Sequence, residues 1–63
     1  MSNDRAEGNW KELKGKAQKK WGKLTDDDLD QVEGRRKELV GKLQKAYGKS
    51  KEDAQREVDE FFS

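Results

Sequence analysis

The 63-residue chain contains no cysteine, no histidine and no proline. Without cysteine, disulfide bridges and thiolate metal sites are excluded, and so is the class of small extracellular disulfide scaffolds. Without histidine, the commonest metal ligand and general base is missing. Without proline, no residue is present that would interrupt a helix outright.

Long apolar runs are also absent. No run exceeds two residues, as at positions 39–40 and 61–62, so we expect neither a signal peptide nor a membrane span, and a soluble intracellular protein. Charged residues make up 46% of the chain, against about a quarter in ordinary domains, and hydrophobic residues only 29%. This composition approaches that of disordered proteins, but the net charge of +1 lacks the self-repulsion typical of them.

The near-zero net charge conceals alternating blocks. Residues 11–23 carry a net charge of +5 and residues 24–34 carry −5. Residues 35–51 then carry +6, and residues 52–63 carry −4. We expect acidic helices to lie beside lysine-rich ones, where each exposed ion pair contributes about 0.2–1 kcal/mol.

The chain contains an internal repeat. EGNWKELKGKAQKKWGK at residues 7–23 aligns with EGRRKELVGKLQKAYGK at residues 33–49, with eleven of seventeen positions identical. One amphipathic hairpin cannot bury its apolar stripe alone, so we interpret the second copy as the surface against which the first one packs.

Hydrophobic spacing predicts helices. Taking about 100° per residue, Leu13, Ala17 and Trp21 fall on the same arc as Trp10. The second copy places its apolar residues on the equivalent arc: Leu39, Val40, Leu43, Ala46 and Tyr47. Lys, Glu, Gln, Leu and Ala dominate both copies and all favour helices. The fold class predicted is therefore all-α.

Helix ends are also marked. Gly22 and Gly48 each follow an aromatic residue at the end of an apolar stripe, where we expect left-handed C-terminal caps. Thr25 and Ser50 follow as N-caps, with acidic residues in the next turn, where the helix dipole favours them. Each repeat is thus predicted to be a lysine-rich helix, a glycine stop, a hydroxyl cap and an acidic helix.

Between the two copies we predict a short helix at residues 26–33 and a longer one at residues 35–47, with a bend near Gly34. The alternative is one long helix. The whole prediction is a single domain over residues 1–63, a small bundle of about four helices in two packed hairpins. Trp21 and Tyr47 are expected to act as equivalent anchors, one for each repeat.

The residues offer little chemistry. Asp26, Asp27, Asp28 and Asp30 lack the spacing of a calcium-binding loop, and helix capping explains them better. Only lysines and carboxylates remain as candidate catalytic groups, and so small a domain has little room for a ligand pocket. We therefore expect no enzyme, no cofactor, no metal and no catalytic or cofactor-binding residue.

Two surface features have alternative interpretations. The lysine clusters could follow a phosphate backbone, but the acidic segments oppose this, the pI of about 7.9 is low for such a domain, and both tryptophans lie on the core arc. Gly15 and Gly41 lie inside lysine-rich helices, away from the apolar arc. We interpret them as part of a solvated face, the alternative being a surface for close approach of a partner.

The strings NWKELKGKAQKKWGKLTDDD and LVGKLQKAYG resemble the CsbD-like family of small bacterial proteins, over nearly the whole chain. The resemblance implies an all-α bundle of about four helices, similar to the SAM-like arrangement of two crossed helical hairpins. It also implies a cytoplasmic protein associated with the general stress response, and it supplies no catalytic residue, cofactor or ligand. The function expected is a non-catalytic interaction or protectant protein, monomeric and without a membrane role, whose protein partner is unknown. The less favoured alternative is a small nucleic-acid-binding module.

Overall fold

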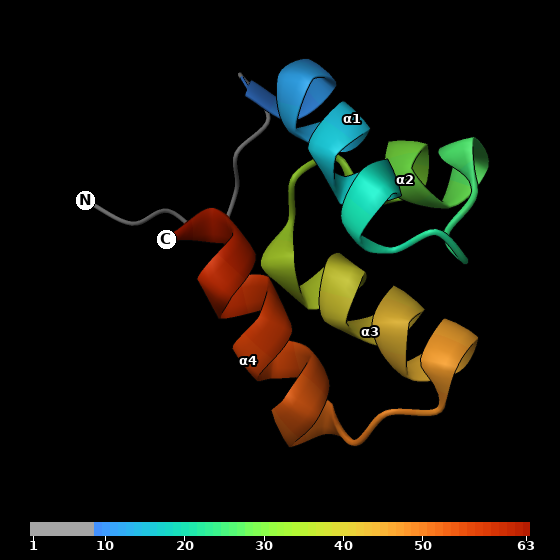
Figure 1. Cartoon of the computed structure of the whole chain (residues 1–63), viewed down its shortest axis with the longest axis vertical. Helices are drawn as coiled ribbons and strands as arrows, with labels where there is room; N and C mark the ends of the chain where they lie inside the picture. The colour runs from blue at the N-terminus through green and yellow to red at the C-terminus, as the bar shows by residue number, and fades with distance from the viewer. Residues whose placement is uncertain (1–8) are drawn as a thin grey trace.

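The computed structural model describes residues 9–63, and this part of the chain forms four α-helices. In chain order they are α1 (Trp10–Lys20), α2 (Asp26–Val32), α3 (Arg36–Tyr47) and α4 (Lys51–Phe62) (Figure 1). The prediction of an all-α bundle of about four helices is confirmed. The first two residues of the repeat, Glu7 and Gly8, lie outside the described residues.

Both hydroxyl N-caps form as predicted. The Thr25 hydroxyl accepts a hydrogen bond from the backbone N–H of Asp28 at 3.0 Å, and the Asp28 carboxylate accepts one from the Thr25 N–H at 3.1 Å. This reciprocal capping box satisfies two N–H groups at the start of α2. At the start of α4 the Ser50 hydroxyl accepts from the Asp53 N–H at 3.1 Å.

The chain breaks between α2 and α3, as we favoured over one long helix. Glu33 and Gly34 both adopt left-handed backbone conformations, with φ of 53° and 78°. A left-handed residue cannot continue a right-handed helix, and glycine tolerates the conformation without steric penalty. The predicted boundaries are correct to within one residue.

One predicted cap is wrong. Gly48 does end α3 in the left-handed region, at φ of 68°, but Gly22 is not left-handed. Helix α1 instead ends before Trp21, whose backbone is extended at φ of −121° and ψ of 81°. This extended residue turns its indole into the core, where it is 2% exposed, and the helix ends at Lys20, two residues before the glycine.

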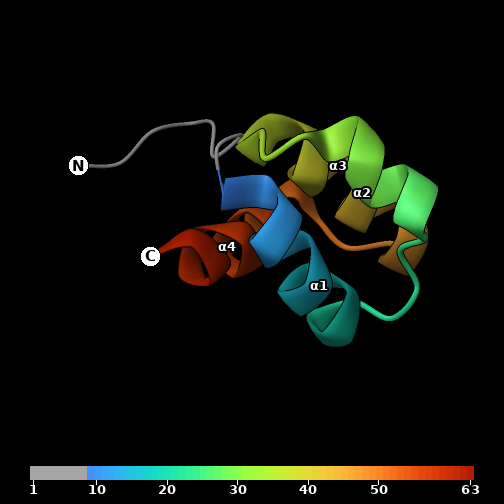
Figure 2. The same ribbon diagram turned by 90° about the horizontal axis from the view of Figure 1, so that it is seen from above.

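Residues from all four helices and from the loop after α1 form one hydrophobic core. Its fully buried members include Leu29, Leu39, Leu43, Val32 and Val58. Helix α2 packs against both α1 and α3, and α3 packs along α4, so the helices of each predicted hairpin are in contact. Helices α1 and α3 approach the core from different sides (Figure 2).

The end of α4 closes the bundle against α1. The Trp10 ring stacks on Phe62 with centroids 6.3 Å apart, and the Trp21 ring lies 5.0 Å from Phe61. The Trp10 indole N–H donates to the Leu29 carbonyl at 2.8 Å, which satisfies its buried polar atom. Both aromatic residues of α4 lie outside the repeat, so the core does not have the symmetry of the sequence.

The expectation that Trp21 and Tyr47 are equivalent anchors is therefore wrong. Trp21 is buried between α1 and α4, whereas Tyr47 is only half-buried. The Tyr47 hydroxyl lies near the surface and accepts a hydrogen bond from the Lys23 backbone N–H at 3.2 Å. Within residues 9–63, no partner corresponding to Phe61 stacks on the Tyr47 ring, which instead contacts the ammonium groups of Lys23 and Lys49.

Candidate functional site

The acidic segment of α2 serves helix capping and ion pairing. Hydrogen bonds from Thr25, the backbone N–H first, lower the pKa of the Asp28 carboxyl. Lys14 of α1 contacts Asp26 at 3.0 Å and also Asp30, and the bond to Asp30 is the main cause of its raised pKa. Within residues 9–63 no group of three or more acidic side chains is arranged to hold a metal ion. The capping interpretation of these carboxylates is supported by the hydrogen bonds of Asp28.

The opposite charge blocks do lie side by side, as predicted. Lys42 of α3 lies 3.6 Å from Asp28 of α2, and Arg36 of α3 lies 2.8 Å from Asp59 of α4. Lys42, Asp28 and Arg36 are half-buried and Asp59 is exposed, and each such pair at the surface adds only modestly to stability.

Glu57 of α4 contacts residues from two other segments of the chain. Its carboxylate pairs with Lys49 at 2.5 Å and accepts the indole N–H of Trp21 at 2.9 Å. The ion pair with Lys49, and then the bond from Trp21, lower the pKa of the Glu57 carboxyl. A carboxylate held ionised by two donors is a poor general base, so we assign Glu57 a structural role.

Lys11 and Lys19 of α1 are exposed, as are Lys37 and Lys45 at the matching positions of α3, and none of the four has an ion pair with any residue in the described part of the chain. The two lysines on each helix are eight residues apart, about 12 Å along the axis, with a glycine midway. A carbon placed at the Cβ position of Gly15 or Gly41 would meet no atom within 4 Å. The glycines therefore lie on an open, solvated face, as we interpreted them.

We call these two surfaces the lysine–glycine faces. The face on α1 comprises Lys11, Glu12, Gly15 and Lys19, and the face on α3 comprises Lys37, Glu38, Gly41 and Lys45. All eight residues are exposed, and the second set aligns with the first in the repeat. The molecule thus presents the same surface twice.

Comparison of the two copies shows which residues are shared. Six positions of the repeat differ: Asn9/Arg35, Trp10/Arg36, Lys14/Val40, Ala17/Leu43, Lys20/Ala46 and Trp21/Tyr47. In every one of these pairs at least one residue is buried or half-buried. The positions exposed in both copies are identical, and Leu13/Leu39 is the clear case of a shared apolar position. We interpreted the repeat as a device for packing, but the residues that the copies share lie mostly on the surface. The identical positions are visible in the sequence, and the structure is needed to show that they are exposed.

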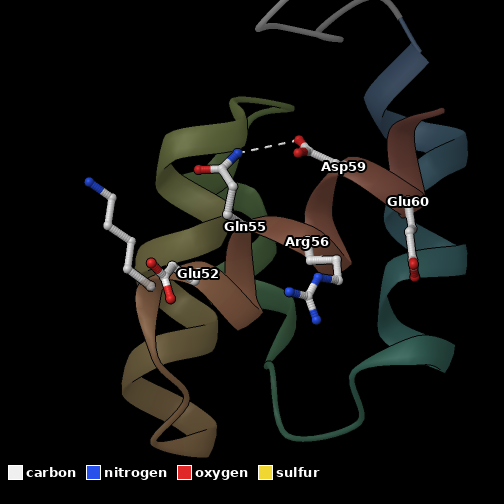
Figure 3. Close-up of a pocket in the computed structure, with 6 residues that line it drawn as sticks. Glu52, Gln55, Arg56, Asp59 and Glu60 are labelled. Carbon is white, nitrogen blue, oxygen red and sulfur yellow. Dashed lines mark hydrogen bonds between the residues drawn. The ribbon is translucent and has the colours of Figure 1, made fainter.

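The outer side of α4 presents the opposite charge. It is formed by Lys51, Glu52, Gln55, Arg56, Asp59 and Glu60 (Figure 3). All six residues are exposed and come from one helix, so they form an open surface and no enclosed cavity. The Asp59 carboxylate pairs with Arg36 and accepts a hydrogen bond from the Gln55 side-chain amide at 3.3 Å. Glu52 and Glu60 have no ion pair within residues 9–63. We call Glu52, Arg56 and Glu60, spaced four residues apart, the acidic face of α4.

A second hollow lies between α1 and the end of α4, where Leu13, Phe61 and Phe62 are flanked by Lys16 and Lys20. The three apolar residues are only partly buried, but they pack against the core cluster. This hollow is the edge of the core.

The tryptophans, which a single-strand nucleic-acid module would use for base stacking, are both buried. No helix in the described part of the chain is long and apolar enough to cross a membrane. The fold and surface together define a class: small helical bundles with a closed core and a densely charged exterior.

The sequence comparisons identify the family. The chain belongs to the CsbD-like family, whose model matches residues 4–56. It is 62% identical over 63 residues to a UPF0337 protein of Mesorhizobium japonicum, covering 100% of this chain and 94% of the relative. It is 56% identical to a UPF0337 protein of Rhodopseudomonas palustris (100% and 96% covered) and 56% identical to one of Bordetella pertussis (98% and 94% covered). The predicted family is confirmed.

Proposed function

We propose that residues 1–63 act as one domain, a non-catalytic, cytoplasmic interaction or protectant protein associated with the general stress response. The observation that carries the proposal is the division of the molecule into a closed apolar core and an exterior of charged side chains, two of whose faces are repeated. The two carboxylates with lowered pKa values, Asp28 and Glu57, are held in a helix cap and in an ion pair. The core is complete within one chain, which supports a folded unit that is monomeric when dilute.

Protection by this chain requires a folded surface, in contrast to protectants that are disordered. We expect a cooperative thermal transition in calorimetry and a helical far-ultraviolet spectrum, because the buried tryptophan and leucine residues couple all four helices. A coil-like spectrum without a transition would contradict the folded unit.

The direct test is protection of a heat- or desiccation-sensitive reporter enzyme. We expect the chain to preserve more reporter activity than an equal mass of an unrelated globular protein. A variant unfolded by Trp21→Ala is the matched control, since it keeps the charge and loses the folded surface. Equal protection by both would show that charge alone suffices and would contradict a role for the fold.

Nucleic-acid binding is the competing function, and the exposed lysines of α1 and α3 are its support. The acidic faces of α2 and α4 and the burial of both tryptophans oppose it. Titration with duplex DNA at low and high salt separates the two, because phosphate contacts make affinity fall steeply with salt. We expect the response to DNA to be the same at low and at high salt.

A further inference from the structure

The acidic face of α4 and the lysine–glycine faces match in charge and in spacing. Glu52 and Glu60 are eight residues apart, as are Lys11 and Lys19 on α1 and the two lysines of α3. Each pair therefore spans about 12 Å along its helix. Two helices placed side by side at this register bring both carboxylates opposite both ammonium groups.

The centres of the faces match as well. Arg56 lies midway along the acidic face, where it projects a long cation, and Gly15 lies midway along the face on α1, with no side chain. An arginine can lie over the glycine without a clash. It then approaches Glu12, which is three residues before Gly15 and so its neighbour on the helix surface. In α3, Gly41 and Glu38 have the same relation.

These faces cannot satisfy one another within one chain. Each of the three helices uses its other side to line the same core, so its charged face is directed outward. Asp59 meets Arg36 inside the chain, whereas Glu52, Glu60 and the four exposed lysines make no ion pair among residues 9–63. The net charge of +1 leaves little long-range repulsion between copies.

We propose that a second copy of this chain docks the acidic face of its α4 on a lysine–glycine face of α1 or α3. This inference rests on the proposed function, because it names one partner for a protein that acts through its surface. The contact is heterologous, with one acidic face and two lysine–glycine faces for each copy, so copies add head to tail and form open chains unless their rotation closes a ring. Exposed ion pairs are weak, so the dissociation constant is about 1 mM.

The experiment is sedimentation velocity together with amide chemical shifts, measured up to about 2 mM chain at low ionic strength. The average sedimentation coefficient should rise continuously with concentration, with shifts confined to the outer sides of α1, α3 and α4. At an ionic strength of about 1 M the Debye length is about 3 Å, and the chain should be monomeric. A chain that stays monomeric at low salt, or shifts located on α2, would overturn the inference.

Substitutions that neutralise single charges test the pairing itself. Glu52→Gln with Glu60→Gln should abolish association, and Asp27→Asn with Glu33→Gln, which changes the net charge equally, should leave it intact. Lys11→Gln, Lys19→Gln, Lys37→Gln and Lys45→Gln together should also abolish it. Mixing this variant with Glu52→Gln/Glu60→Gln should restore association, since each keeps the face that the other has lost.

The outcomes are distinguishable. A mixture that stays monomeric, or equal loss in the Asp27/Glu33 control, would refute the pairing. All substituted residues are exposed, so unchanged melting curves would show that the variants fold. If the lysines bind duplex DNA and the chain does not associate, both this inference and the proposed function fail. If the chain protects the reporter enzyme while remaining monomeric, only this inference fails.

Discussion

The two copies of the repeat differ most clearly at their equivalent aromatic residues. Trp21 is 2% exposed, packs against Phe61 and donates to Glu57, whereas Tyr47 is half-buried and contacts two lysines. The cause is α4, whose terminal phenylalanines pack against the first copy. A duplicated sequence has thus produced a shared exterior around a core that is not symmetric.

The largest effect should come from truncating these aromatics. Trp21→Ala should lower the free energy of unfolding by about 3 kcal/mol or more, because it leaves a cavity and removes the indole hydrogen bond to Glu57. A loss of this size is enough to unfold so small a domain. Tyr47→Ala should cost only about 1–2 kcal/mol, since the ring is half-exposed. Urea denaturation of both variants is the measurement, and equal losses would restore the symmetric interpretation.

The second difference between the copies concerns the glycines that follow these aromatics. Gly48→Ala places a side chain in the left-handed region and should destabilise the fold by about 1–2 kcal/mol. Gly22→Ala should change stability by less than about 0.5 kcal/mol, because its conformation is not left-handed and its surroundings are open. Thermal melting of the pair checks this, and similar losses at both would contradict the asymmetric helix ends.

Where the copies agree, substitutions should have equal effects. Gly15→Ala and Gly41→Ala should each stabilise the fold by about 0.5–1 kcal/mol, through higher helix propensity and a less flexible unfolded chain. The two single variants and their combination can be compared by calorimetry. The effects should add, because the sites lie on different helices and share no partner.

The smallest effect concerns pH, at the residue that connects the two copies. Glu57 joins Trp21 to Lys49, and its pKa is held below the ordinary 4.5. Its stabilisation is therefore present above that value and is lost as pH falls through the lower folded pKa. Glu57→Gln should make the melting temperature depend less on pH in the acid range. Glu60→Gln is the matched control. Glu60 makes no ion pair within the described residues, so this variant should keep the parent's dependence of melting temperature on pH.

Local signals in the sequence predicted most of the fold. The period of apolar residues, the hydroxyl caps at Thr25 and Ser50 and the break at Gly34 each depend on neighbours within one turn. The errors at Gly22 and Tyr47 have a different origin, because both depend on where Phe61 and Phe62 pack. That contact joins segments forty residues apart along the chain and has no counterpart in the repeat.

The candidate surfaces were predictable only in part. The sequence showed the lysine clusters and the glycines at seven-residue intervals, and it correctly predicted that Gly15 and Gly41 are solvated. It did not show that every position differing between the copies is buried or half-buried in at least one of them, because burial depends on the tertiary arrangement. The four-residue spacing of Glu52, Arg56 and Glu60 places them on one side of a helix. Their exposure depends on the tertiary arrangement, in which the opposite side of α4 lines the core.

The balance of charge has a consequence for any solution that holds this chain at high concentration. Fifteen basic and fourteen acidic side chains bind water strongly, yet each molecule requires only one compensating anion. A protein of the same charge density but of one sign would bring a cloud of counterions with it, and those ions would dominate its osmotic pressure. This chain can reach high concentration while adding little more than its own particle number to the osmotic pressure of the solution.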